Sequence, residues 1–582
     1  MTGRPHRLGR VGALACAVGA LTVVVAALPW LRGDDPARSV LRARLEDREI
    51  DPAALAAVRS ELHLAGNPLQ GAADWLIAAA RGDFGTSWVA GVPVRDLLLP
   101  AAGASASLAA AASVVAVVVG VALVAPVAWA LSGERRSPGR CARGVRVAGA
   151  VVAALSEVAL AAALLILVGV RWRLVPVAGW FGPSYMLLPA LALGVPTGGL
   201  FARLVVIAAD VTAEEPWVRT WRAVGCGRIT LTAGIVRRAV TVAVPQVAVL
   251  FAGLLGGAVV VEQMFAVPGL GRLSLQAALA QDLPVVQGCV LTLVLAGTAA
   301  GASGIVAQRV MLGAAGAAAT LVPAAPARSL RPRRRTPLVM AAVLTAPILA
   351  GLLRDPHGVR LEQRLSVPSW AYPLGTDPVG RDVLARFGHG AVLTIGLAAA
   401  VTAAGLLVGL VVGLRGSAAR VGVVDILNAL PFVLIGLTIA AVLGPGLVSA
   451  AISAALVACV PIVVHTRSLA AEVRASGYHQ AAVLAGAGAG WILRRHLLPA
   501  VIGPVLAYAV TRVPSTALAI AALGFLGIGA GHDTPEWGAE LSVALDYLER
   551  APTLAAAPVL GLILLGVLAG FAPAELGQRP AD

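Results

Sequence analysis

The chain has 582 residues, of which 58% are hydrophobic and 13% are charged, and this composition excludes a soluble globular protein and makes lipid the solvent of most of the chain. The net charge of +15 does not indicate nucleic-acid binding, because the arginines stand in short segments between apolar runs, as the positive-inside rule predicts for a membrane protein. The chain contains no lysine, which excludes a GxxxxGK[ST] phosphate-binding loop and hence a standard ATP-hydrolysing site.

Apolar runs long enough to cross about 30 Å of hydrocarbon recur along the chain. In chain order they lie near 11–29, 104–131, 147–170, 186–209, 241–263, 286–312, 337–353, 391–414, 423–443, 446–465, 500–523 and 554–572. They predict an all-α polytopic membrane protein with about twelve transmembrane helices, six in each half. The first run follows three arginines, so a cleaved signal peptide is the alternative, but its length exceeds the roughly 7–15 apolar residues of a signal-peptide core.

Charge predicts the orientation of these spans. Arginines gather in alternate loops, at 135–146, 219–238, 309–336, 415–420 and 467–495. The opposite loops are 31–103, 354–390 and 524–553, of which the last is acidic. By the positive-inside rule the first set is cytoplasmic, so we expect both termini in the cytoplasm and the two six-helix halves to run in parallel.

An Ala/Pro/Arg-rich segment at 313–336 separates the halves. This composition cannot build a core and is typical of an extended connector. We therefore expect one half at 1–312, with an extracytoplasmic segment at 31–103, a cytoplasmic linker at 313–336, and a second half at 337–582.

Residues 478–499 of the second half read YHQAAVLAGAGAGWILRRHLLP and fall in a predicted cytoplasmic loop. This stretch resembles the EAA loop of ABC importer permeases, with Ala481, Ala482, Gly486, Leu498 and Pro499 at the expected spacings. The resemblance implies a short helix that docks on an ATPase subunit, ended by Gly486 at positive φ. Gln480 departs from the family, which usually has Glu there.

The first-half counterpart at 217–245 is a weaker match. Ala223 and Gly225 stand where the family's turn would lie, but Arg238 replaces the expected proline. An ordinary arginine-rich cytoplasmic loop stays open as the alternative for this copy.

Four further segments resemble peptide-type permeases on the extracytoplasmic side. RGDFGTS (81–87) and GGAVVVEQMFAVPGLGRL (256–273) are similar to B-type permeases, and PLGTDPVGRDVLAR (373–386) and ALGFLGIGAGHDTPEWG (522–538) to C-type permeases. Their Gly, Pro and polar residues are typical of re-entrant turns that satisfy their own backbone near the membrane face. The candidate gate residues are Glu262, Pro268, Gly269, Gly271, Gly375, Thr376, Asp377, Gly380, Arg381, Asp382, Pro535, Trp537 and Gly538.

The resemblance implies a B-type and a C-type permease half of the dipeptide, oligopeptide and nickel importer family, fused in one chain of the plasma or inner membrane. Its expected partners are two ABC ATPase subunits or one fused ATPase, which carry the ATP and Mg²⁺, and an extracytoplasmic solute-binding protein. We expect no cofactor, metal or catalytic residue in this chain. An ion-coupled secondary transporter is the alternative, disfavoured because few ionisable residues fall deep in the spans. The sequence leaves open whether the cargo is a dipeptide, an oligopeptide, nickel or another solute.

Overall fold

A computed structural model describes residues 52–62, 68–133, 140–316, 335–415, 432–529, 531 and 533–571, together with single residues 19, 22, 23, 25, 26 and 41. Over these residues the regular secondary structure is helical, and the β-type pairing consists of two isolated bridges. The expected all-α class is therefore confirmed. The predicted linker lies largely outside the described residues.

The first half of the structure runs from α4 to α13. Its helices are α4 (Pro52–Leu62), α5 (Pro68–Ala80), α6 (Val94–Leu131), α7 (Arg140–Ala154), α8 (Glu157–Leu164), the π-helix η1 (Leu165–Arg171), α9 (Pro183–Thr212), α10 (Pro216–Ala223), α11 (Arg228–Met264), α12 (Leu270–Leu279) and α13 (Leu283–Gly316).

The second half runs from α14 to α23. Its helices are α14 (Arg335–Leu352), the 3-10 helix η2 (Leu361–Gln363), α15 (Val383–Arg415), α17 (Phe432–Leu443), α18 (Leu447–Ala475), α19 (Gly477–Leu484), α20 (Ala489–Ile492), the π-helix η3 (Leu493–Leu497), α21 (Leu498–Phe525), α22 (Trp537–Leu545) and α23 (Pro552–Phe571).

Seven helices of the described chain are long and apolar enough to cross a membrane, or up to eight if a bent pair counts as one span. α14 and α23 are shorter apolar helices. Most of the predicted run 11–29 and the segment 416–431 before α17 lie outside the described residues. The structure thus shows a multi-pass membrane protein, while the total of twelve spans stays a prediction.

The predicted run 147–170 is not one straight helix. Its two parts, Gly144–Ala154 and Glu157–Arg171, meet at an angle of 92°. Ser156 has extended backbone and Glu157 opens the first turn of α8, where a carboxylate is favoured by the helix dipole. The sequence carries this local start signal within an otherwise uninterrupted apolar run.

Glycines at four-residue spacing allow the long helices to pack closely. On α9, a β-carbon at Gly194 or Gly198 would lie 2.6 Å or 2.8 Å from a backbone carbonyl oxygen of α6. In the second half, β-carbons at Gly409 and Gly413 of α15 would each lie 2.6 Å from a side chain of α18, and one at Gly405 would lie 3.2 Å from its backbone. Such small-residue stripes are the usual means of close helix contact in membranes.

The two halves interlock. α23 packs on α7 and α8, and α17 packs on α11, α12 and α13. Gly566 of α23 approaches Ala154 so closely that a β-carbon would lie 2.5 Å from its carbonyl oxygen. A hydrophobic cluster with members from both halves forms the main core, so the described halves make one packed unit.

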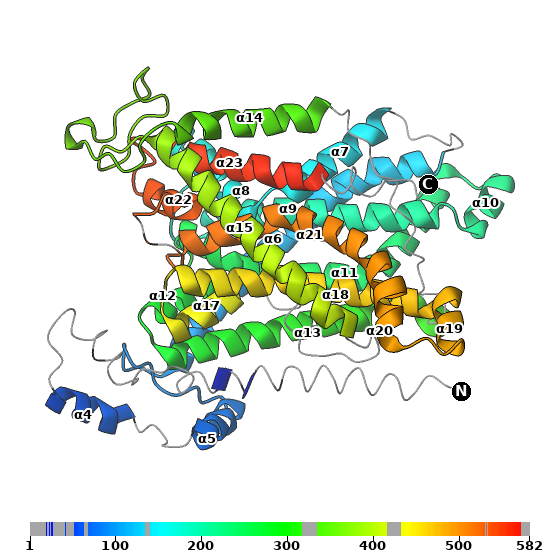
Figure 1. Ribbon diagram of the computed structural model, residues 1–582, viewed down its shortest axis with the longest axis horizontal. Coiled ribbons are helices and arrows are strands. Elements are labelled where there is room, and N and C mark those ends of the chain that lie inside the picture. Colours follow the sequence, from blue (N-terminus) through cyan, green and yellow to red (C-terminus); the bar gives the residue numbers. More distant parts are fainter. Residues whose placement is uncertain are drawn as a thin grey trace.

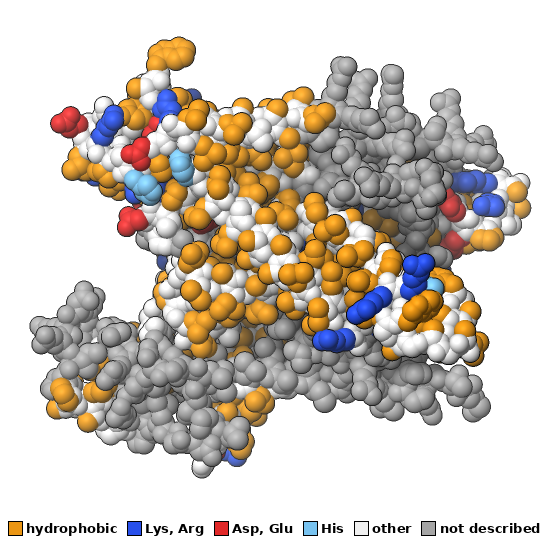
Figure 2. Space-filling view, in the orientation of Figure 1, with side chains coloured by type: hydrophobic (Ala, Val, Ile, Leu, Met, Phe, Trp, Pro, Cys, Tyr) orange, Lys and Arg blue, Asp and Glu red, His pale blue; other side chains and the backbone are white. Residues whose placement is uncertain are grey.

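The elements with sequence motifs lie at two opposite ends of the molecule. α10 and α19 lie at one end, at the right of Figure 1, and α12 and α22 lie at the other. In Figure 2 hydrophobic side chains cover most of the described surface between the ends, and the charged side chains gather at the ends. The polar ends and the apolar middle have the distribution expected of a protein that crosses a bilayer.

Candidate functional site

The loop after α9 is a short helix closed by a left-handed glycine. α10 follows Glu215, whose backbone is extended, and ends before Gly225, which has φ = 73°. The N–H of Cys226 donates to the carbonyl of Trp221 over 2.9 Å, and the N–H of Gly225 donates to that of Arg222 over 3.1 Å. This pair of hydrogen bonds is the Schellman motif, which glycine at the left-handed position favours.

The loop after α18 has the same construction. α19 follows Ser476, which is extended, and ends before Gly486, which has φ = 80°. The N–H of Ala487 donates to the carbonyl of Ala482 over 3.1 Å, and the N–H of Gly486 donates to that of Val483 over 3.0 Å. The two loops therefore share one backbone design, although their side chains differ.

Both loops present apolar side chains to the outside. No residue of α19 is buried, and Leu484 at its end is 89% exposed. Val224 and Ile229 in the first loop are also exposed. An exposed apolar patch at a polar end of the molecule marks a surface suited to contact another protein.

The predicted coupling residues all lie in these loops or at the start of the helix that follows. They are Ala223 and Gly225 in the first loop, Gln480, Ala481, Ala482 and Gly486 in the second, and Leu498 and Pro499 in the first turn of α21. The side chain of Gln480 is exposed and makes a long 3.5 Å contact with the carbonyl of Ala475. It is therefore available to a partner.

An arginine in or directly before each loop bonds to the carboxyl end of a long helix, α6 in the first half and α15 in the second. Arg222 of α10 donates from Nη2 to the carbonyl of Leu131 over 2.5 Å. Arg474, in the last turn of α18, donates to the carbonyl of Leu414. Because Leu131 and Leu414 lie at the carboxyl ends of α6 and α15, each guanidinium satisfies a terminal carbonyl and complements the helix dipole.

At the opposite end, a buried carboxylate caps α12. Ser105 of α6 donates to Glu262 Oε1 over 2.6 Å, and the N–H of Arg272 donates to Oε2 over 3.0 Å. The N–H of Gly271 also donates to this carboxylate, and the N–H of Leu270 donates to Ser105 Oγ over 2.8 Å. The first three N–H groups of α12, which have no partner within the helix, are thereby satisfied.

A second buried carboxylate caps α22 in the same way. Glu536 accepts from the N–H groups of Gly538 and Ala539, each over 2.9 Å. Thr394 of α15 donates to Glu536 Oε1 over 3.2 Å, and the N–H of Trp537 donates to Thr394 Oγ1 over 3.3 Å. Burial raises the pKa of Glu536 to about 7, although these hydrogen bonds favour the ionised form.

Glycines leave room for both carboxylates. A β-carbon at Gly269 would lie 2.3 Å from the carboxyl carbon of Glu262, and one at Gly271 would lie 2.9 Å from its Oε2. In the second half, a β-carbon at Gly524 would lie 1.9 Å from Glu536 Oε2. The predicted glycines 269 and 271 are thus required by the approach of a carboxylate as well as by chain turning.

Matching turns precede α6 and α15. Gly85 has φ = 83° and Gly375 has φ = 81°. The following threonines form the isolated bridges, Thr86 with Pro93 and Thr376 with Asp382. The carbonyl of each glycine accepts the N–H of the first residue of the helix, over 2.9 Å and 3.2 Å.

An aspartate holds each turn, but its position in the chain differs between the two halves. In the first half, Asp282 after α12 accepts from the Ser87 hydroxyl and from the N–H of Trp88 over 3.1 Å. In the second half, Asp377 lies within the turn and accepts from Arg381 Nε over 2.6 Å and from its N–H over 2.8 Å.

The predicted C-type residues beside this turn pack tightly against the preceding segment. Asp382 caps α15 by accepting the N–H of Leu384 over 2.9 Å, and it pairs with Arg354 over 2.5 Å. Gly380 has φ = 83°, and a β-carbon there would lie 1.8 Å from the carbonyl oxygen of Arg360. Gly380 and Asp382 therefore stabilise the structure of the predicted gate.

An ion pair joins α15 to α22. Arg386 is 1% exposed, and its Nε lies 2.6 Å from Glu540 Oε1. Burial raises the pKa of Glu540, and the Arg386 charge opposes that rise. At the matching positions of α6 and α12 stand Leu97 and Leu273, which both pack against the main core.

The remaining predicted gate residues lie on the same caps. Trp537 is fully buried and donates from Nε1 to the carbonyl of Phe387 over 3.0 Å. A β-carbon at Gly390 would lie 2.0 Å from the carbonyl oxygen of Pro535. Pro268 is exposed in the turn before α12.

The candidate site residues named from the sequence omitted Ser105, Thr394 and Glu536 of these caps, and also Asp282, which holds the turn before α6. Serine and threonine inside an apolar helix give no local signal for a tertiary partner, because they also bond to their own helix backbone. Glutamate is not a preferred N-cap residue, so Glu536 carried none either. For Ser105, Thr394 and Asp282, only the pairing of distant segments reveals their role.

Comparison with known proteins adds independent findings. The model of the family of binding-protein-dependent transport system inner membrane components matches twice, at residues 122–312 and 394–579. A di/tripeptide transport system permease protein of Pseudomonas aeruginosa is 38% identical over 245 residues, which cover 40% of this chain and 80% of the relative. A metal-staphylopine import system permease protein of Staphylococcus aureus is 30% identical over 264 residues, 45% of this chain and 83% of the relative. A probable D,D-dipeptide transport system permease protein of Escherichia coli is 32% identical over 218 residues, 36% and 72% respectively.

Proposed function

The chain belongs to the family of binding-protein-dependent transport system inner membrane components, and from this premise we propose that it forms the translocation pathway of an ATP-driven importer for peptides or related small solutes. The observation that carries the proposal is the pair of matching loops at one end of the molecule. One chain offers two docking helices, α10 and α19, for two ATPase domains.

The mechanical basis of coupling is the tie between each loop and a long helix. Arg222 in the first loop bonds to the end of α6, and Arg474, directly before the second loop, bonds to the end of α15. A displacement of α10 or α19 by a closing ATPase is thereby passed to helices that reach the opposite end. There Ser105 of α6 and Thr394 of α15 hold the caps of α12 and α22. Alternating access follows from this linkage of both ends through α6 and α15.

The end with α12 and α22 is the proposed extracytoplasmic face, and the end with α10 and α19 is the proposed cytoplasmic face. The arginine-rich loops support this orientation by the positive-inside rule, and with it both termini fall in the cytoplasm. A solute-binding protein delivers cargo to the extracytoplasmic face. The halves are 1–312, with its extracytoplasmic segment 31–103, and 337–582, joined by the linker 313–336.

The names of the relatives support two classes of cargo, di- or tripeptides and metal–staphylopine complexes. None of the comparisons supports the ion-coupled alternative. ATP and Mg²⁺ belong to the ATPase partner, because the chain has no lysine for a phosphate-binding loop, and no cofactor or resident metal is proposed for this chain.

Reconstitution tests the proposal. The chain is placed in liposomes with its co-purifying ATPase and a solute-binding protein, and uptake of labelled dipeptides and of nickel chelates is followed with ATP or with an ion gradient. We expect uptake only with ATP and no hydrolysis by the chain alone. Uptake driven by an ion gradient without ATPase would instead establish a secondary transporter.

A further inference from the structure

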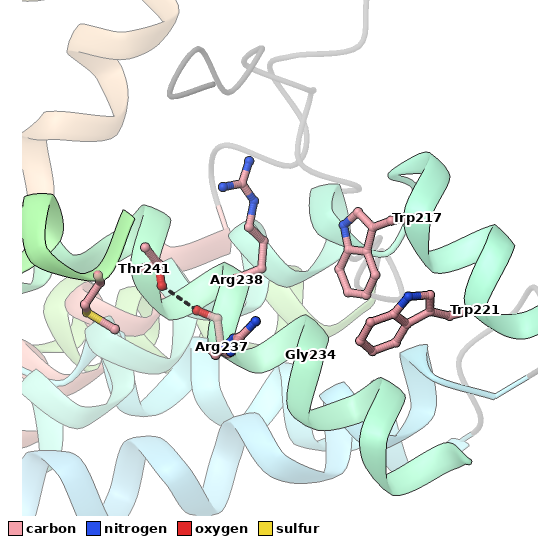
Figure 3. Close-up of a pocket in the computed structure, with 7 residues that line it drawn as sticks. Trp217, Trp221, Gly234, Arg237, Arg238 and Thr241 are labelled. Atoms are coloured by element: carbon pink, nitrogen blue, oxygen red, sulfur yellow. Dashed lines mark hydrogen bonds between the residues drawn. The ribbon is translucent and has the colours of Figure 1, made fainter. Parts of the chain in front are cut away.

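We propose that a cavity beside α10 binds the phosphate headgroup of an anionic phospholipid from the adjoining leaflet. The cavity has a volume of about 600 Å³. It is lined by Trp217, Trp221, Gly234, Arg237, Arg238, Thr241 and Met311 (Figure 3). These residues come from α10, α11 and α13, so the cavity lies where a docking helix meets two membrane spans.

The charge of the cavity suits a phosphodiester. Arg238 pairs with Glu215 over 3.5 Å, and Trp217 donates from Nε1 to the same carboxylate over 2.7 Å. The guanidinium of Arg237 is exposed, and no partner for it is found among the described residues. Among the described residues the charge of Arg237 is therefore not neutralised, and a guanidinium binds phosphate by two parallel charge-assisted hydrogen bonds.

The remaining lining is aromatic and apolar. The rings of Trp217 and Trp221 meet edge to face, with centroids 5.0 Å apart. Gly234 makes room for them, since a β-carbon there would lie 3.2 Å from the Trp221 ring. Met311 is exposed, and Val310 beside it on α13 is exposed as well. A soluble anion needs no such apolar lining, whereas a lipid headgroup with its glycerol and acyl carbons does.

The depth of the cavity agrees with a headgroup. The apolar spans that flank it are Gln246–Met264 and Leu283–Gln308. Thr241 and Met311 lie just beyond the ends of these spans, at the boundary between hydrocarbon and water. Tryptophan is enriched at this depth, and basic pockets between spans bind anionic headgroups there.

The second half lacks the same chemistry. Leu498 and Pro499 stand at the positions that match Arg237 and Arg238, and Ala482 matches Trp221. The linker 317–334 carries arginine as its only charged residue type, so charge disfavours it as an occupant. The proposal is therefore one anionic lipid per chain.

Native mass spectrometry of the full chain in detergent tests this inference without the ATPase, so its failure is separate from failure of the proposed function. The chain is titrated with phosphatidylglycerol, phosphatidylcholine of the same acyl chains, or inorganic phosphate. We expect one phosphatidylglycerol to bind about tenfold more tightly than phosphatidylcholine. Arg237→Gln should abolish this preference, and Arg237→Lys should retain part of it.

The matched control is Arg219→Gln, which removes an exposed arginine of α10 that does not line the cavity. It should bind phosphatidylglycerol like the unaltered chain. Equal preference in Arg237→Gln and Arg219→Gln would overturn the site. Saturable binding of inorganic phosphate that Arg237→Gln removes, with no preference between the two lipids, would overturn the lipid as its occupant.

Discussion

The two halves form equivalent structures at both ends of the molecule, but the residues that form them agree at one end and differ at the other. At the end with α10 and α19 they use one backbone design with a glycine at the same place, Gly225 and Gly486. At the end with α12 and α22 the same caps are built from carboxylates supplied by different elements, Glu262 at the end of α11 and Glu536 just before α22. A left-handed backbone conformation requires glycine at one particular position. A capping carboxylate, in contrast, can come from either of the two elements that meet at the cap.

The membrane-spanning helices show a similar difference between the two halves. The stripe of glycines lies on α9 in the first half and on α15 in the second, so the small residues are on opposite members of the same helix pair. Close approach needs only one small partner at each crossing point. The two halves thus keep the geometry while exchanging the residues that produce it.

The largest expected effect comes from the ion pair between α15 and α22. Arg386→Leu leaves the partly buried Glu540 without its partner, and we expect a loss of about 3 kcal/mol in the free energy of unfolding. The double change Arg386→Leu with Glu540→Leu imitates Leu97 and Leu273 of the first half and should recover most of that loss. Thermal unfolding of the purified protein measures both. A double variant as unstable as the single one would break the equivalence of the two halves.

The glycine stripes give the next effect. Gly198→Ala on α9 and Gly409→Ala on α15 place a β-carbon 2.8 Å from a backbone oxygen and 2.6 Å from Ile462, and overpacking of this kind costs about 1–3 kcal/mol. Gly301→Ala is the control, because nothing lies within 4 Å of its β-carbon. If all three variants have the same Tm, the stripes do not hold the helix pairs.

A substitution at Gly486, in the loop after α18, tests backbone strain without steric crowding. A β-carbon at Gly486 meets nothing within 4 Å, so the effect of Gly486→Val comes from its positive φ, at about 1–3 kcal/mol. Asparagine adopts positive φ more readily than valine, so Gly486→Asn is the control. We expect Val, and not Asn, to lower recovery of the ATPase and cargo uptake while insertion stays normal. Full coupling in Gly486→Val would remove this loop from the mechanism.

A further test concerns the pH dependence of stability that comes from the second-half cap. The folded pKa of Glu536 is raised from 4.5 to about 7 by burial. Its stabilising contribution is therefore fully present below pH 4.5 and is lost as the pH rises to about 7. Glu536→Gln should flatten this part of the profile of Tm against pH. An unchanged slope would show that another group titrates there.

Much of this structure could be predicted from the sequence. Apolar runs predicted the helices, and the resemblance of residues 478–499 to the EAA loop predicted a left-handed glycine at Gly486, because both signals are local. The bend between α7 and α8 was missed because it falls within one apolar run. Ser105, Thr394 and Asp282 were missed because each bonds to a segment far away in the chain, a relation that spacing cannot reveal.

The central proposal is that one chain supplies both docking helices. Native mass spectrometry of the complex purified with its ATPase measures this directly through the number of chains and ATPase domains. We predict one chain with two ATPase domains, one for each of the two proposed docking helices, α10 and α19. A complex with two copies of this chain on two ATPase domains would contradict the account, because half of the docking helices would then be unused.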